Sequence, residues 1–120
     1  MTGHVDDFGR AILQIEVQHP VAAKSEVWDA WIDAACTGEL IAPLARIQSL
    51  GLDQAARVKA GLGDGSQVLL DTYTCHIDWF GKTRKVEIVA STGSFPLIGV
   101  GLLEDHELNI HYPNRTVQLG

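Results

Sequence analysis

The stretch that decides the fold is Trp31 to Gly38, which has the sequence WIDAACTG. It continues a segment, Val27 to Ile32, that is rich in residues favouring β-strands. The pattern predicts a strand that ends at Asp33 and is followed by a turn of small residues.

On both sides of this stretch, alternating apolar and polar residues predict more strands. From Arg10 to Gln18 apolar residues recur at every second position, which is the period of a half-buried strand. A longer strand ends at Trp79 and turns through Phe80-Gly81-Lys82 into Arg84 to Ala90, which predicts a hairpin. One face of the longer strand is expected to carry Leu69, Tyr73, Cys75, Ile77 and Trp79, and the other face Thr72, Thr74, His76 and Asp78.

Glycine and proline positions mark the connections between these elements. Pro43 to Gly51 has proline at a first helical position and glycine at the stop, which predicts one short helix. Three glycines between positions 61 and 65 predict a mobile hairpin tip over Ala60 to Ser66. The most apolar run, Phe95 to Leu103, is expected to be buried, with two glycines where backbones approach closely. Leu108 to His111 and Thr116 to Leu119 predict a terminal hairpin.

The composition fits one packed domain. Apolar residues make up 46% of the 120 residues and charged residues 20%, which is an ordinary globular balance. Dividing the chain in two would leave each half short of buried core, so we expect a single domain over residues 1–120. Nine Lys and Arg against fifteen Asp and Glu give a formal charge of -6, and the basic residues do not cluster. The charge argues against a nucleic-acid partner.

The sequence gives no sign of membrane insertion or export. The longest apolar runs fall well short of the roughly 20 residues that span a bilayer. The first seven residues are polar and acidic, unlike the start of a signal peptide. Cys36 and Cys75 could form one bridge at most, and a chain this rich in apolar residues does not need one. We expect a cytoplasmic protein with free thiols and no membrane partner.

Taken in order, these features resemble the retroviral-type, or retropepsin-like, aspartic proteases. In that family Asp-Thr-Gly or Asp-Ser-Gly follows an apolar strand, and Asp33-Ala34-Ala35 occupies the matching place. The family's glycine-rich hairpin, called the flap, is matched by residues 60–65. Its later motif of two apolar residues and glycine before a short helix is matched by Leu97-Ile98-Gly99. The resemblance covers most of the chain and implies an all-β, closed, barrel-like fold with one or two short helices.

The resemblance also implies a site and its partners. Peptide hydrolysis in the family uses two carboxylates about 3 Å apart that share one proton. This chain carries one such motif and is too short for two lobes, so the second Asp33 is expected from an identical chain in a homodimer. The implied substrate is a peptide or protein, cut by an activated water without a metal or another cofactor. The implied catalytic residue is Asp33, and the implied substrate-binding residues are Ala35, Cys36, Thr37, Gly61, Leu62, Gly63 and Leu97.

The motif departs from the family's pattern at two positions. Ala34 stands where the family has a Thr or Ser hydroxyl that bonds across the dimer axis, and Ala35 adds a methyl group where the family has glycine. A second interpretation is therefore a noncatalytic dimer that keeps the fold and binds extended peptides without cutting them. A third is a structural oligomerisation domain whose glycine-rich hairpin has no ligand.

Other candidate sites have weaker support in the sequence. Zinc could be bound by Cys36, Cys75, His76 and His111, but these residues lack the spacing of a zinc motif. Cys75 and His76 are also expected on opposite faces of one strand. Cys36 could be a nucleophile, but the sequence fixes no histidine near it, so we interpret it as pocket lining.

Overall fold

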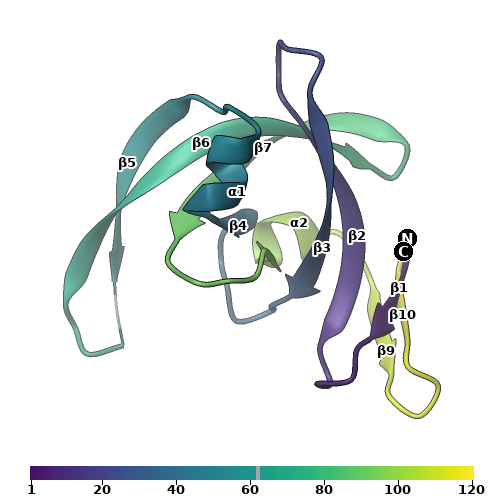
Figure 1. Cartoon of the computed structure of the whole chain (residues 1–120). Helices are drawn as coiled ribbons and strands as arrows, with labels where there is room; N and C mark the ends of the chain where they lie inside the picture. Colours follow the sequence, from purple (N-terminus) through teal and green to yellow (C-terminus); the bar gives the residue numbers. More distant parts are fainter. Residues whose placement is uncertain (62) are drawn as a thin grey trace.

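The structure is a computed structural model that describes residues 1–61 and 63–120. It consists mainly of β-strands with two short helices, so the predicted all-β class is confirmed (Figure 1). In chain order, the described elements are β1 (Thr2–Val5), β2 (Ala11–Gln18), β3 (Ser25–Ile32), β4 (Leu40–Pro43), α1 (Leu44–Ser49), β5 (Gln54–Gly61), β6 (Gln67–Trp79), β7 (Lys82–Ser91), β8 (Leu97–Ile98), α2 (Val100–Leu103), β9 (Leu108–His111) and β10 (Thr116–Leu119).

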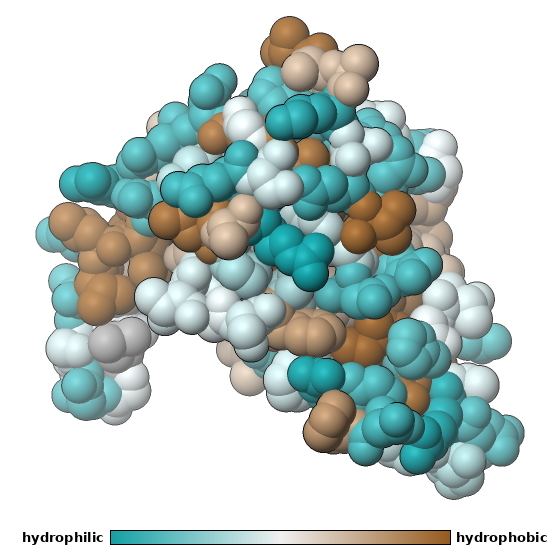
Figure 2. Space-filling model, in the orientation of Figure 1, coloured by the Kyte–Doolittle hydropathy of each residue, from teal (hydrophilic) through white to brown (hydrophobic). Residues whose placement is uncertain are grey.

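All the described strands belong to one sheet, in the order β5-β6-β7-β4-β8-β3-β2-β1-β10-β9. An additional pairing of β6 with β2 closes part of this sheet on itself. The β5–β6 hairpin and the terminal strands project on the lower side of the view (Figure 1). Figure 2 shows that the surface between these two projections is hollowed.

The core lies inside the curled sheet and follows the predicted alternation. In β2, Leu13, Ile15 and Val17 are buried while the residues between them are exposed. In β3, Trp28 is fully buried in the same way. Since side chains alternate across a strand, these two strands each present an apolar face to the inside.

Strand β8 lies between two strands that are adjacent to the Asp33 segment in the sequence. It pairs parallel to β3, with Ile98 beside Ile32, and antiparallel to β4, with Ile98 beside Leu40. The chain thus leaves β3, forms the loop of residues 33–39, and returns as β4 on the far side of β8. This crossing anchors both ends of the Asp33 loop to the same central strand.

Burial along β6 does not follow the two predicted faces over the whole strand. Leu69 is 62% exposed, whereas it was expected on the face of Cys75, and Thr72 is fully buried. The β5–β6 register shifts between Gln54 and Ala56, opposite this part of β6. Such a bulge bends the hairpin, and beyond it the two strands leave the core. Beyond that point, the alternation of apolar and polar residues no longer predicts which side chains are buried.

The helices are short, and one helix boundary differs from the prediction. Pro43 ends β4 with an extended ψ of 140°, so α1 begins one residue later, at Leu44. Gly51 ends that helical segment with a φ of +66°, as expected for a glycine stop. Within residues 1–61 and 63–120, neither helix is long and apolar enough to cross a membrane.

The predicted terminal hairpin is confirmed and consists of β9 and β10. Strand β1, in contrast, was not predicted. Strand β1 has four residues, most of them outside the core, and it lies between β10, from the other end of the chain, and β2, with which only His4 and Val5 pair. The longer pairing, with β10, joins segments far apart in the sequence and leaves no local pattern.

The crossing at β8 predicts that Gly99 cannot carry a side chain. A Cβ atom built on Gly99 would lie 2.1 Å from the carbonyl oxygen of Gly38, whereas one on Gly93 would meet nothing closer than the Ser91 hydroxyl at 3.6 Å. We expect Gly99→Ala to lower the free energy of unfolding by about 2–3 kcal/mol, since backbone must move to make room. Gly93→Ala should change it by less than about 0.5 kcal/mol. Urea denaturation of both variants tests this, and equal stabilities would contradict it.

Candidate active site

The backbone of Asp33 is fixed on both sides directly after β3. Its N–H donates to the carbonyl of Ile98 at 2.8 Å, and its own carbonyl accepts the N–H of Cys36 at 3.1 Å. The carboxylate Oδ1 accepts the N–H of Ala35 at 3.0 Å, and the residue is half-buried. The side chain is therefore held by its own turn and still reaches solvent.

The rest of the loop is held by backbone hydrogen bonds to the glycine-containing segment that follows β8. Three carbonyls of the loop accept three consecutive N–H groups, so the two segments are joined residue by residue. The bonds run from Val100 N to Cys36 O (2.8 Å), from Gly101 N to Gly38 O (3.0 Å) and from Gly99 N to Glu39 O (2.9 Å). Side chains on the glycines would prevent this approach.

Glu39 ties the end of the loop to β7, a link that the sequence analysis did not identify. Its Oε1 accepts the N–H of Glu87 at 3.0 Å, and its Oε2 pairs with Nη2 of Arg84 at 3.1 Å. The same Arg84 nitrogen donates to the carbonyl of Gly101 at 3.2 Å. An ion pair that also satisfies backbone groups orders its surroundings more than an isolated surface pair does.

The structure brings most of the predicted site residues to the end of β3. Asp33, Ala35, Cys36 and Thr37 lie in one loop, and Leu97 lies beside it, paired with Trp31 and Ile41. Cys36 and Leu97 are half-buried, whereas Ala35 and Thr37 are exposed.

The predicted flap residues lie apart from this loop within the single chain. The predicted hairpin is present, since Gly61 pairs with Gln67 across the tip, and Gly61 and Gly63 are exposed there. Leu62, also predicted to bind substrate, is outside the described residues. Among residues 1–61 and 63–120, no hydrogen bond connects the tip to the Asp33 loop, and the hollow in Figure 2 lies between them.

An apolar groove runs beneath the β5–β6 hairpin and was not predicted. Its volume is about 440 Å³, and its walls come from β4, α1, β6 and β7. The exposed Leu69 and Leu44 would have signalled it, because exposed large apolar side chains mark binding surfaces when they gather. The groove is lined by Ile41, Leu44, Leu69, Leu70, Asp71, Val89, Ala90, Ser91 and Thr92.

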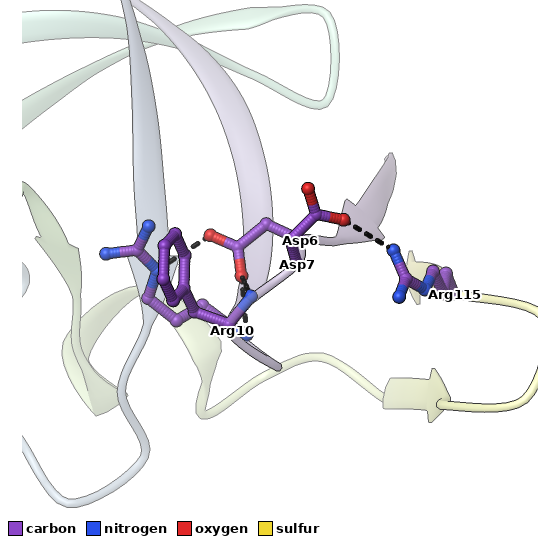
Figure 3. Close-up of polar contacts among 5 residues, drawn as sticks. Asp6, Asp7, Arg10 and Arg115 are labelled. Carbon is purple, nitrogen blue, oxygen red and sulfur yellow. Dashed lines mark hydrogen bonds and ion pairs between the residues drawn. The ribbon is translucent and has the colours of Figure 1, made fainter.

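A cluster of one cation and three aromatic rings lies beside the end of β3. The Arg10 guanidinium is 4.3 Å from the ring centre of Phe95 and 5.6 Å from that of Trp31. It also lies 5.1 Å from the ring of Phe8. Asp6 orients the guanidinium, with Oδ2 2.7 Å from Arg10 Nε (Figure 3). The pKa of Asp6 is lowered by hydrogen bonds from Arg10 and Phe8, which outweigh its desolvation.

The alternative zinc site is not assembled. Cys75 is fully buried in the core, and Cys36 lies in the Asp33 loop. Among the residues that the structure describes, no three His, Cys, Asp or Glu side chains gather in a way that could hold a metal ion.

The fold matches solved structures of aspartic proteases. A retropepsin-like aspartic protease from Rickettsia conorii is 14% identical, with a TM-score of 0.65 over 99% of this chain and 88% of that chain. EIAV protease, in complex with the inhibitor HBY-793, is 14% identical, with a TM-score of 0.59 over 80% of this chain and 86% of that chain. Simian foamy virus (mac) protease is 16% identical, with a TM-score of 0.50 over 77% of this chain and 92% of that chain.

Neither a protein-family profile nor a curated protein matches the sequence. The structural likeness, at identities this low, shows the fold. This chain has the retropepsin fold predicted from its sequence.

The two cysteines should differ sharply in reactivity. Burial, with a smaller contribution from the charge of Glu39, raises the pKa of the Cys75 thiol to about 12. At pH 8 only about one Cys75 in ten thousand is then a thiolate, the reactive form, and the buried sulfur is also shielded. We expect a disulfide reagent to modify one thiol per native chain, at Cys36, and two in denaturant. Cys36→Ser should leave no fast-reacting thiol, and two fast thiols in the native chain would contradict this account.

Proposed function

We propose that this chain is a retropepsin-like aspartic endopeptidase, with residues 1–120 acting as one protease domain. The observation that carries the proposal is the Asp33 loop, whose carboxylate is partly exposed and whose backbone is locked to the segment after β8. One such loop supplies one carboxylate, and the chemistry needs two. The active form is therefore a homodimer in which each protomer contributes Asp33.

In this mechanism one Asp33 is ionised and the other is protonated, since two carboxylates that close cannot both ionise. The ionised Asp33 takes a proton from a water molecule, whose oxygen attacks the carbonyl carbon of the peptide bond. The protonated Asp33 polarises that carbonyl and then gives its proton to the leaving nitrogen. The carbon–nitrogen bond breaks to give a carboxylic acid and an amine.

We propose that two groups of residues bind substrate, one in and beside the Asp33 loop and one in the β5–β6 hairpin. The first group, beside Asp33, consists of Ala35, Cys36, Thr37 and Leu97. The second group forms the proposed flap and consists of Gly61, Leu62 and Gly63. The apolar groove under the β5–β6 hairpin can hold apolar side chains of an extended peptide. Its surface, together with the absence of a basic cluster, favours a peptide over a nucleic acid.

Asp33 should be essential for cleavage. We expect the wild type to cleave a peptide library slowly at mildly acidic pH, because Ala34 removes a hydroxyl bridge and Ala35 crowds the loop. Asp33→Asn should lower kcat/KM by about 10²–10⁴-fold, the usual contribution of a positioned acid or base. Asp29→Asn, which changes an exposed carboxylate on β3, is the matched control and should retain activity. The double variant Ala34→Thr with Ala35→Gly should cleave faster than the wild type.

Two outcomes would contradict parts of this proposal. Full cleavage by Asp33→Asn would exclude the aspartic mechanism. A wild type that binds peptides without cutting them, beside a double variant that does cut, would make the noncatalytic peptide-binding dimer the better interpretation.

The β5–β6 hairpin should act as a lid over bound peptide. Asp64 orders the tip locally: its Oδ1 accepts both the N–H and the hydroxyl of Ser66, and these bonds lower the pKa of Asp64. We expect amide hydrogens from Gly63 to Ser66 to exchange fast in the free protein and more slowly with a peptidic inhibitor of aspartic proteases. Exchange of the core strand β2 should be slow in both states, as an internal control. Strong protection of the tip without ligand would argue against a lid.

A further inference from the structure

A separate hollow lies away from the Asp33 loop, where the turn between β2 and β3 meets β6 and β7. Its volume is about 380 Å³, which is in the range of pockets that hold small ligands. Figure 1 shows this turn at the top of the view, on the opposite side of the molecule from the β5–β6 tip and the terminal hairpin. None of its lining residues belongs to the Asp33 loop or the apolar groove. The polar lining consists of His19, Asp53, Gln54, Thr74, His76 and Lys85.

Three of these side chains project from the same face of the β6–β7 ladder. His76 lies directly opposite Lys85, and Thr74 lies two residues before His76, so the three share a face. The intervening Cys75 and Ile77 are fully buried on the other face. An ammonium, an imidazole and a hydroxyl group can each donate a hydrogen bond. In the part of the chain that the structure describes, these three side chains make neither a hydrogen bond nor an ion pair, so their donors are free for a ligand.

The imidazole of His19 is a fourth donor, and its own turn fixes the orientation of the ring. Its Nδ1 accepts the N–H of Val21 at 3.1 Å and the N–H of Ala22 at 2.9 Å. Because Nδ1 is an acceptor in both bonds, the proton of the neutral ring is on Nε2. The side chain that lines the hollow therefore offers an N–H donor that is already oriented before any ligand binds.

The hollow also has one carboxylate and some apolar surface. Asp53, in the connection between α1 and β5, is exposed, and within the described residues it forms no ion pair with Lys85. The neighbouring Gln54 already donates to Asp71 at 3.1 Å. Pro20 and Val21 line the hollow on the side of the β2–β3 turn. Four free donors, one of them a cation, thus lie beside an apolar wall, in a chain whose formal charge is -6.

We propose that this hollow binds a small organic phosphate, a monoester whose phosphate group lies beside Lys85. The ammonium of Lys85 supplies a charge-assisted hydrogen bond to a phosphate oxygen, and the imidazoles of His19 and His76 donate to others. The hollow is larger than a phosphate group, and the apolar wall suits the organic part of the ester. The carboxylate of Asp53 repels the ligand and limits its affinity. The site does not depend on the proposed protease activity.

Titration with phenyl phosphate, followed by amide NMR at low ionic strength, tests the site. Saturable shifts are expected for the amides of Val21, Ala22 and Lys85, with those of β10 unchanged. Lys85→Met should raise the Kd about tenfold or more, because it removes a charge-assisted hydrogen bond. Lys82→Met is the matched control, since it removes the same charge from an exposed residue on the opposite face of β7, and it should leave the Kd unchanged.

Two further arms test the sign of the charge effect and the organic part of the ligand. Asp53→Asn should lower the Kd about threefold or more, because it removes a negative charge beside the anion. Inorganic phosphate should bind at the same amides but more weakly than phenyl phosphate, because it makes no contact with the apolar wall. Phenol, which lacks the phosphate group, should not bind there.

Several results would overturn this site. They are a wild type without saturable shifts at these amides, a Lys82→Met variant that binds as weakly as Lys85→Met, and an Asp53→Asn variant that binds less tightly than the wild type. Inorganic phosphate that binds as tightly as phenyl phosphate would overturn the choice of a monoester. Thermal melting of each variant verifies that the chain is folded. Because the titration measures binding alone, its result is independent of whether Asp33 cleaves peptides.

Discussion

The close approach of two backbone segments, residues 33–39 and 98–101, is the constraint on which the site depends. Four hydrogen bonds between them fix Asp33, Cys36, Gly38 and Glu39. The approach leaves no room for a side chain on Gly99. Because the segments meet through backbone atoms, these hydrogen bonds do not depend on the side chains of Ala34 and Ala35. The Glu39–Arg84 pair adds a second attachment, from the loop to β7.

Much of the fold could be predicted from local patterns, because burial on one face leaves a period of two in the sequence. This held for β2, β3, the β6–β7 hairpin and the terminal hairpin. It failed at Leu69 and Thr72, where a bulge in the partner strand turns the β5–β6 hairpin out of the core. It also missed β1, a strand of four residues that pairs over three residues with the opposite end of the chain and over two with β2.

The candidate site was predictable in part, for a related reason. Asp33 and Leu97 could be placed together because each lies in a short motif of a recognisable family pattern. The Glu39–Arg84 pair and the Arg10 aromatic cluster could not be predicted, because their members carry no motif. Glu39 and Arg84 are 45 positions apart, and Arg10 and Trp31 are 21 positions apart. The apolar groove under the hairpin became visible when Leu69 proved to be exposed. Contacts between distant segments are the part that a single sequence does not encode locally.

The central claim is that two copies of Asp33 form one site. Calorimetric titration with a peptidic inhibitor that mimics the tetrahedral transition state of aspartic proteases tests it most directly, because the stoichiometry counts chains per site. The account predicts one inhibitor bound per two chains, with binding lost in Asp33→Asn and kept in Asp29→Asn. One inhibitor per chain, or binding that survives Asp33→Asn unchanged, would contradict it.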